Sequence, residues 1–333
     1  MSKQGILLMY VGTPDAYSLK AVVRYLRQFL SDPRVIDLVF LVRFFLVNFI
    51  ILPSRVRKTV AAYRKIWLKE GSPLLVYSVR IKEALAVELG EDYQVELGMR
   101  YGDPNIETAL SRFKNCDNIR VLPLFPQYSS AATGSAIAQL LKVCSKKWNI
   151  PSINIKKDFY NDPNFIEAYA DIISRNIQGK KRELLLFSYH GLPKRHLDKS
   201  QCYAECRQNE ICAVADRCNP YCYKAQCYAT SNMLAARLNL SASQYRVSFQ
   251  SRLGVTPWIE PYTDFILPKL AREGIRNIAV VCPSFVVDCL ETLEEINIRA
   301  REQWKILGGQ AFIFIPCLNH DPIWIKALAS MLR

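Results

Sequence analysis

A histidine at the end of a buried strand is the residue in this sequence best placed to do chemistry. The apolar run Leu184–Phe187 has the length of a buried strand and leads into a turn that contains His190, Gly191 and Pro193. In an open α/β sheet, ligands bind beyond the carboxyl ends of the strands. An imidazole there can accept a proton near neutral pH or ligate a metal ion. Taken alone, His190 is better explained as a loop residue that only forms hydrogen bonds.

A group of acidic side chains forms the second chemical feature. Asp288, Glu291 and Glu295 are spaced i, i+3 and i+7, which places them on one face of an α-helix. Acids near a helix N-terminus are stabilised by the helix dipole, and this accounts for Asp288 and Glu291 without any function. It accounts less well for Glu295, which lies two turns in. Such a row could carry protons away from a site or guide a divalent cation toward it.

Six of the eleven cysteines follow the His190 turn closely. They are Cys202, Cys206, Cys212, Cys218, Cys222 and Cys227. Their spacing matches neither a standard zinc ribbon nor a plant-type ferredoxin. Thiolates bind soft metals, so the stretch predicts an iron–sulfur cluster or a zinc site, with free thiols or disulfides as alternatives. A metal site needs four ligands, and the spacing does not decide which four of the six supply them.

Short apolar runs alternate with helix-periodic segments along the chain, and together they must position these side chains. The expected strands are 6–11, 74–76, 93–98, 119–125, 153–156, 184–189, 245–249, 278–281 and 312–315. The expected helices are 19–30, 56–68, 81–89, 135–146, 164–175, 228–238, 264–273 and 291–306. This alternation predicts an α/β fold with parallel sheets flanked by helices. Nine strands favour two lobes with a cleft between them over one doubly wound domain.

Composition narrows the class of partner. The chain has 333 residues, 50% of them hydrophobic, and a formal net charge of +14. A positive surface favours anionic partners: a carboxylate-bearing small molecule, anionic lipid or nucleic acid. Nucleic acid is disfavoured because the sequence has no long Lys/Arg block and no RNA-binding motif. Eleven cysteines without an export signal predict the reducing cytoplasm.

Residues 35–52 form an apolar segment that is interrupted by Asp37, Arg43 and Asn48. The interruptions leave no uninterrupted run of about 18 residues, so a transmembrane helix is not expected. The density of Phe, Leu, Val and Ile predicts an apolar lip that dips into a membrane face or covers a hydrophobic ligand. Ordinary core packing explains the segment about equally well.

Six motifs occur in one order across nearly the whole chain. They are Val11–Pro14, Leu97–Gly102, Leu122–Ser129, Ser188–Pro193, Phe249–Arg252 and Asp288–Glu295. In this series the sequence resembles the ferrochelatases, which insert ferrous iron into protoporphyrin in the last step of haem synthesis. The resemblance implies two Rossmann-like, chelatase-like lobes with the porphyrin in the cleft between them. Residues 1–120 plus 316–333 would form the N-terminal lobe, and 121–315 the C-terminal lobe.

The resemblance also implies roles for individual residues. His190 and Glu291 would be the metal-binding and proton-handling pair for Fe²⁺, with Asp288 and Glu295 extending an acidic track. Arg55, Tyr63 and Ser72 match positions that contact the porphyrin in the family. A porphyrin is a large apolar disc with acidic propionates at one edge, so an apolar lip and a basic rim suit it.

The resemblance bears on the cysteines and on alternative functions as well. Some ferrochelatases carry a [2Fe-2S] cluster, which favours that cluster for the insertion 202–227. Cys289 stands where some members have histidine, and Val11 where others have tyrosine. The alternatives are a chelatase for coproporphyrin or another tetrapyrrole, and a cluster-bearing sensor that has lost catalysis. The presence of both His190 and Glu291 argues against the sensor.

Overall fold

The computed structural model describes residues 3–200, 220–254 and 256–333. Its contacts divide the chain into two compact units. Unit 1 contains the described residues up to Phe125, together with Ser129–Asp158 and Asn319–Arg333. Unit 2 contains Pro126–Tyr128 and the described residues of Phe159–Leu318.

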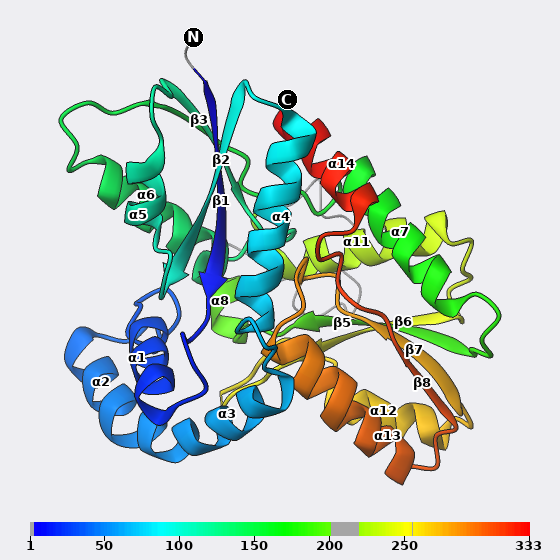
Figure 1. Cartoon of the computed structure of the whole chain (residues 1–333). Helices are drawn as coiled ribbons and strands as arrows, with labels where there is room; N and C mark the ends of the chain where they lie inside the picture. Colours follow the sequence, from blue (N-terminus) through cyan, green and yellow to red (C-terminus); the bar gives the residue numbers. More distant parts are fainter. Residues whose placement is uncertain (1–2, 201–219, 255) are drawn as a thin grey trace. The chain divides into compact units, whose positions relative to one another are not determined.

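Unit 1 is built on a four-stranded parallel sheet (Figure 1). The strands are β1 (Gln4–Gly12), β2 (Tyr93–Tyr101), β3 (Asn118–Pro123) and β4 (Ser152–Ile155), in the order β2-β1-β3-β4. The helices are α1 (Leu19–Leu30), α2 (Phe40–Phe45), η1 (Leu46–Ile51), α3 (Leu52–Ile66), α4 (Pro73–Leu89), α5 (Ile106–Arg112), η2 (Ser130–Gly134), α6 (Ser135–Cys144) and α14 (Pro322–Leu332). Helices α4 and α14 lie on one side of the sheet, and α5 and α6 on the other. Such two-sided cover explains why β1 is an almost continuous apolar run.

Unit 2 repeats this plan with a second parallel sheet in the order β6-β5-β7-β8. Its strands are β5 (Leu184–His190), β6 (Tyr245–Gln250), β7 (Asn277–Val281) and β8 (Ala311–Phe314). Its helices are α7 (Pro163–Ile177), α8 (Lys194–Lys199), α11 (Tyr223–Arg237), α12 (Thr263–Arg272), η3 (Glu291–Ala300) and α13 (Arg301–Ile306). The central strands β5 and β7 are the most deeply buried, apart from His190 at the end of β5.

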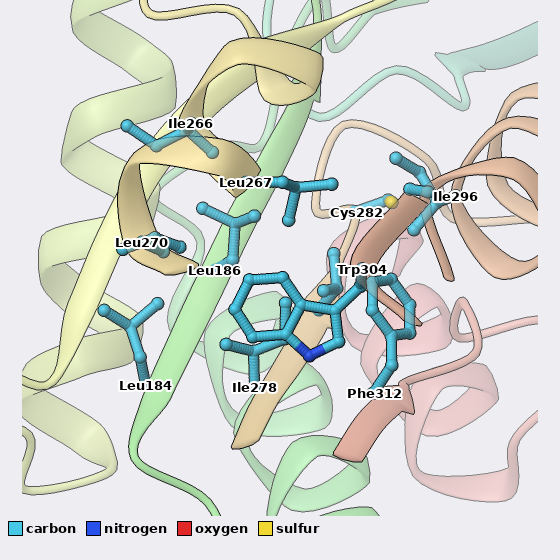
Figure 2. Close-up of a cluster of buried hydrophobic side chains, with 12 residues drawn as sticks. Leu184, Leu186, Ile266, Leu267, Leu270, Ile278, Cys282, Ile296, Trp304 and Phe312 are labelled. Carbon is cyan, nitrogen blue, oxygen red and sulfur yellow. The ribbon is translucent and has the colours of Figure 1, made fainter. Parts of the chain in front are cut away.

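One hydrophobic cluster holds α12 and α13 against the sheet of unit 2 (Figure 2). Strand side chains such as Leu186 and Ile278 meet Leu267 of α12 and Trp304 of α13. The Trp304 indole is 1% exposed and donates a hydrogen bond to the Ala311 carbonyl at 3.0 Å. Burying large side chains of this kind contributes roughly 1.5–3 kcal/mol each, so the cluster fixes the helices on the sheet.

In the described part of the chain, eight of the nine expected strands are present, each within a few residues of its expected bounds. The ninth, 74–76, is wrong because these residues form the first turn of α4, where Pro73 occupies a position that favours a helix start. Five helical segments of the described chain, α2 with η1, α5, η2, α8 and α14, were not expected.

The observed division of the chain also differs from the expected lobe boundary at residue 120. Residues 129–158 belong to unit 1, because β3 pairs with β1 and β4 in turn pairs with β3. The C-terminal helix α14 belongs to unit 1 as well, where it packs on α4.

The apolar segment 35–52 is helical from Phe40 onward. It comprises α2, η1 and the start of α3, which follow one another without a break. Arg43, which interrupts the apolar run, is buried and donates hydrogen bonds to the Leu38 and Ile36 carbonyls at 2.6 and 3.3 Å. Among the described residues, no helix is long and apolar enough to cross a membrane.

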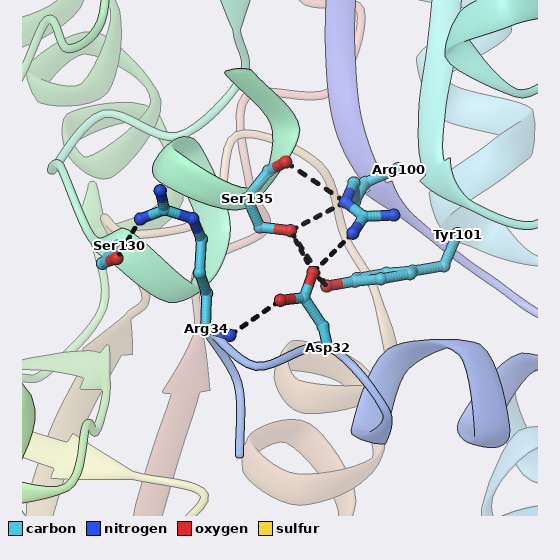
Figure 3. Close-up of polar contacts among 6 residues, drawn as sticks. All are labelled: Asp32, Arg34, Arg100, Tyr101, Ser130 and Ser135. Atoms are coloured by element: carbon cyan, nitrogen blue, oxygen red, sulfur yellow. Dashed lines mark hydrogen bonds and ion pairs between the residues drawn. The ribbon is translucent and has the colours of Figure 1, made fainter. Parts of the chain in front are cut away.

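A buried carboxylate anchors the chain where it leaves α1 toward this segment (Figure 3). Asp32 accepts hydrogen bonds from the Arg34 backbone N–H, the Arg100 guanidinium and the hydroxyls of Tyr101 and Ser135, at 2.5–2.8 Å. Burial raises the pKa of Asp32, but these hydrogen bonds and the Arg100 charge outweigh it and hold the pKa below its ordinary value. Asp32 therefore stabilises the fold as a carboxylate.

Replacement of the Asp32 carboxylate should destabilise the folded protein. We expect Asp32→Asn to lower the free energy of unfolding at pH 7 by about 3 kcal/mol, because it leaves Arg100 without its buried partner. The matched control is Asp15→Asn, which breaks an exposed ion pair with Arg24 and should cost less than about 1 kcal/mol.

The pH dependence of this effect has a defined sign. Because the folded-state pKa is lowered, the Asp32 contribution is present above the unfolded-state pKa of about 3.9 and is lost as pH falls through the folded value. Urea denaturation between pH 3 and 7 should show the wild-type advantage over Asp32→Asn shrinking in acid. An advantage that stays constant over this range would contradict the assignment.

Candidate active site

His190 is the last residue of β5, the strand that pairs with both β6 and β7. It stands opposite Gln250, the last residue of β6. The next residue must be glycine, because a Cβ on Gly191 would lie 2.8 Å from the Gln250 carbonyl oxygen. The Gly191 N–H donates to that same oxygen at 2.8 Å. The close approach of β5 and β6 thus fixes the backbone on which His190 stands.

Hydrogen bonds fix the His190 imidazole as well. Its Nδ1 lies 2.6 Å from the Gly191 carbonyl oxygen, which can only accept, so Nδ1 carries the proton. The Nε2 lone pair is left for a metal ion or a substrate proton. The backbone is held by Ser284, which accepts from the His190 N–H at 3.0 Å, and by Tyr223, which donates to its carbonyl at 2.7 Å. Trp258 and Phe285 flank the ring at 6.5 and 6.1 Å between centroids.

Glu291 and Glu295 lie on η3, which is a π-helix. At its end the Arg301 N–H donates to the Ile296 carbonyl, five residues earlier, where an α-helix would use a residue four earlier. Glu291 opens the helix, and its carbonyl accepts a hydrogen bond from Gln250 Nε2 at 2.9 Å. Gln250 is the register partner of His190, so one residue links the imidazole strand to the acidic helix. Stretches of π-helix are frequent at functional sites.

One residue, Ser251, donates hydrogen bonds to both oxygens of the Glu295 carboxylate. Ser251 donates to it through the backbone N–H at 2.8 Å and through the hydroxyl at 2.6 Å. Ser251 has a φ of +65°, a strained conformation for serine that clusters at functional sites. Burial raises the pKa of Glu295, although Ser251, Arg299 and the nearby His190 oppose the rise. A carboxyl group whose pKa is raised can receive a proton from a neighbouring imidazole closer to neutral pH.

The i, i+3, i+7 spacing predicted that Asp288 shares a helical face with Glu291 and Glu295. This prediction is wrong. The helix begins after Asp288, which lies in the preceding loop. Its Oδ1 accepts from the Thr292 hydroxyl at 2.9 Å and from the Cys317 N–H at 3.2 Å. Asp288 therefore ties the start of η3 to the segment that follows β8.

Three buried thiols lie around this loop and helix start, from Cys282, Cys289 and Cys317. Burial raises the pKa of all three well above the ordinary value. The Cys289 thiol also donates a hydrogen bond to the Glu291 carboxylate, which raises its pKa further. This chain therefore presents a protonated thiol to Glu291.

The three predicted porphyrin contacts lie in unit 1 in different environments. Arg55 is exposed on α3, whereas Tyr63 is 6% and Ser72 3% exposed. The Ser72 hydroxyl is 2.7 Å from Thr13 Oγ1, so it ties the start of α4 to the end of β1. Arg55 is thus the one of these three that faces solvent.

Of the six clustered cysteines, only Cys222 and Cys227 lie within the described residues. Cys222 packs with Leu197, Ala225 and Ala229. Cys227 is fully buried in α11, and burial raises the pKa of its thiol well above the ordinary value although Tyr223 hydrogen-bonds it. Across residues 3–200, 220–254 and 256–333, no three His, Cys, Asp or Glu side chains are grouped to hold a metal ion. Cys202, Cys206, Cys212 and Cys218 lie outside these residues.

Sequence reasoning missed the residues that orient the site. Gln250 and Ser251 belong to the motif Phe249–Arg252, but their contacts cross 41 and 44 positions to η3. Ser284 and Tyr223 reach His190 over 94 and 33 positions. The motif marked Gln250 and Ser251 as worth inspecting, whereas nothing local marked the other two.

Comparison with known proteins shows to which protein family this chain belongs. The ferrochelatase family model matches residues 3–333. A protein named ferrochelatase from Legionella pneumophila (strain Lens) is 52% identical over 331 residues, 99% of each chain. One of the same name from Coxiella burnetii (strain CbuK_Q154) is 49% identical over 335 residues, 100% of this chain and 94% of its own. This chain belongs to the ferrochelatase family.

Solved structures confirm the fold of this ferrochelatase family member. SirB from Bacillus subtilis, solved with Fe³⁺, matches with a TM-score of 0.55 at 12% identity over 98% of this chain and 93% of that chain. DR2241 from Deinococcus radiodurans, a multi-domain protein with structural similarity to chelatases, matches with a TM-score of 0.53 at 10% identity. That match covers 100% of this chain and 55% of DR2241. The chain is thus an enzyme of the metal chelatase class with the two-lobe chelatase fold.

Proposed function

We propose that this enzyme inserts Fe²⁺ into protoporphyrin IX to form protohaem, with His190 and Glu291 as the metal and proton site. Family membership over the whole chain supports the reaction. The observation that carries the site assignment is the fixed Nδ1–H of His190, which leaves Nε2 as a free lone pair. A coproporphyrin substrate is the close alternative, and a comparison of the two porphyrins in the same assay separates them.

The reaction replaces two pyrrole protons by one ferrous ion. Fe²⁺ enters, two N–H bonds break, four Fe–N bonds form and two protons leave, with no change in oxidation state. His190 Nε2 accepts a pyrrole proton, and Glu291 neutralises the metal charge and accepts the second. Glu295 then takes a proton from His190, since its raised pKa brings it closer to that of an imidazole.

The hydrogen bonds of the site keep these groups in place. Gln250 holds the first residue of η3, and Ser251 holds the Glu295 carboxylate from both sides. Positioning of this kind lets the proton acceptors meet the substrate without reorganising. Asp288 keeps a supporting role in this proposal, because its carboxylate is engaged by Thr292 and Cys317.

Replacement of His190 tests the assignment. We expect His190→Ala to lower the rate of anaerobic iron insertion by at least about 100-fold, since a proton acceptor contributes 10²–10⁴. Porphyrin affinity, followed by the shift of the Soret absorption band, should stay within about threefold because imidazole loss leaves the binding surface intact. The matched control is His320→Ala, which removes an exposed histidine stacked on Tyr77 in unit 1 and should retain full activity. Wild-type turnover by His190→Ala would refute the assignment.

We propose that the exposed face of α2 and η1 contacts an anionic membrane surface. Phe40, Phe44, Phe45 and Phe49 form an exposed aromatic cluster, with neighbouring ring centroids 5.7–6.4 Å apart. The segment 19–69 around them carries eleven Lys and Arg against two acidic residues, a net charge of +9. Apolar side chains beside basic ones are the pattern of interfacial helices that bind anionic lipid.

Vesicle sedimentation tests this surface. We expect the wild type to bind vesicles of phosphatidylglycerol and phosphatidylcholine, and added salt to weaken the binding. The double variant Phe45→Glu/Phe49→Glu should bind at least about tenfold more weakly, because each phenylalanine contributes roughly 1.5–3 kcal/mol when buried. Ile306→Glu is the control, since Ile306 is 86% exposed on α13 of unit 2. Equal binding by the double variant and this control would contradict the proposal.

We propose in addition that the cysteine-rich stretch binds a [2Fe-2S] cluster. Of the six cysteines, Cys222 and Cys227 lie within the described residues, and both are buried. A coordinated metal ion deprotonates the thiols that bind it, so burial is compatible with a ligand role. The four ligands are drawn from Cys202, Cys206, Cys212, Cys218, Cys222 and Cys227. No step of the insertion reaction is assigned to this group.

Elemental analysis of anaerobically purified protein tests the cluster. We expect equal amounts of iron and acid-labile sulfide, with visible absorption in the substrate-free enzyme, because a [2Fe-2S] group contains both. Cys116→Ala should retain this sulfide content and serves as the control, since Cys116 lies in unit 1, outside the cysteine-rich stretch. Zinc without sulfide would refute the proposal.

A further inference from the structure

Three aromatic side chains of unit 1 pack edge to face in a row that runs from the interior to the surface. The Tyr63 and Trp67 ring centroids are 5.8 Å apart at 75°, and those of Trp67 and Tyr17 are 5.5 Å apart at 70°. Tyr63 is buried, Trp67 is partly exposed and Tyr17 is 42% exposed. Tyr63 thus supports Trp67 from behind, and Trp67 and Tyr17 present the accessible aromatic surface.

This aromatic row lies where an α/β sheet binds ligands. Trp67 ends α3, and a short turn closed by the Leu68–Gly71 bridge leads to Ser72. The Ser72 hydroxyl is hydrogen-bonded to Thr13, which directly follows β1. The row is therefore joined to the carboxyl end of the strand β1, the edge at which open α/β sheets accept ligands.

Basic residues predominate beside the row, since the nearby acids Asp15 and Glu70 are paired with Arg24 and Arg80. The Arg64 guanidinium lies over the Tyr17 ring, 5.9 Å from its centroid. Helix α3 carries Arg55, Arg57, Lys58, Arg64 and Lys65 and no acidic residue. An exposed aromatic surface with a guanidinium at its edge suits a flat aromatic ligand that bears carboxylates.

We propose that Trp67 and Tyr17 form an aromatic wall of the tetrapyrrole site in unit 1, and that Arg64 pairs with a carboxylate of that ligand. This inference rests on the proposed function, because the tetrapyrrole is the substrate assigned there. Tyr63 becomes a positioning residue that holds Trp67 rather than a residue that meets the substrate. The two rings contact the apolar face of the macrocycle, and Arg64 sets which edge of it lies toward α3.

Binding measurements on aromatic variants test the wall. We expect Tyr17→Ala and Trp67→Ala each to raise the Kd for protoporphyrin IX about tenfold, because each removes an aromatic contact. Trp148→Ala is the matched control, since Trp148 is 99% exposed in the loop between α6 and β4 and should leave the Kd unchanged. Circular dichroism reports whether Trp67→Ala is folded. If it is not, Tyr17→Ala decides, because Tyr17 is exposed and its loss opens no core cavity.

A pair of ligands tests the role of Arg64. Arg64→Ala should bind protoporphyrin IX about tenfold more weakly and its dimethyl ester as the wild type does, because the ester has no carboxylate to pair with. Arg57→Ala, on the same helix, should leave the ratio of the two affinities unchanged. An equal loss for acid and ester in Arg64→Ala would contradict the pairing.

The outcomes separate this inference from the proposed function. Failure of the wild-type enzyme to insert iron refutes the proposed function. A wild type that inserts iron, together with Tyr17 and Trp67 variants that bind protoporphyrin IX with wild-type affinity, refutes the aromatic wall and leaves the function standing.

Discussion

Parallel pairing of β5 with both of its neighbours is the constraint on which the chemistry of unit 2 depends. It brings the carboxyl end of β5, the end of β6 and the loop after β7 to one edge of the sheet. His190 stands at the first of these, Gln250 at the second and η3 follows the third. Because Gly191 has no side chain, the β6 backbone can approach closely enough to fix the His190 main chain. The imidazole then bonds the Gly191 carbonyl, and Gln250 reaches the acidic helix.

Burial gives the groups at this edge different protonation states. The thiols of Cys282, Cys289 and Cys317 stay protonated because burial disfavours their charged form. Burial likewise raises the pKa of Glu295, while hydrogen bonds from Ser251 keep its carboxylate oriented. The reaction must dispose of two protons beside a divalent cation, so it benefits from one nitrogen base and carboxylates of unequal basicity. In unit 1 the opposite balance holds at Asp32, where hydrogen bonds outweigh burial and the carboxylate is stabilised as an anion.

Much of the fold follows from local patterns, and part of the site does not. Helix α1 has the expected bounds, since Ser18 caps it and its apolar face is regular. His190 was identified because a strand end is recognisable in the sequence. The π-helix was not, because bonding five residues back leaves no distinct apolar period. Asp288 was wrongly placed on this helix, although it lies in the loop before it. The strained φ of Ser251 depends on tertiary contacts, as do the side-chain partners of Asp32, which lie 68–103 positions away.

The central claim is that the carboxylate which opens η3 takes part in metal insertion. Replacement of Glu291 by glutamine preserves shape and removes the charge and the proton-accepting oxygen. Anaerobic single-turnover mixing of Fe²⁺ with the enzyme–protoporphyrin complex, followed by metalloporphyrin absorbance, measures the step directly. The account predicts that Glu291→Gln slows insertion by at least about 100-fold while porphyrin affinity is unchanged. Insertion at the wild-type rate would contradict it.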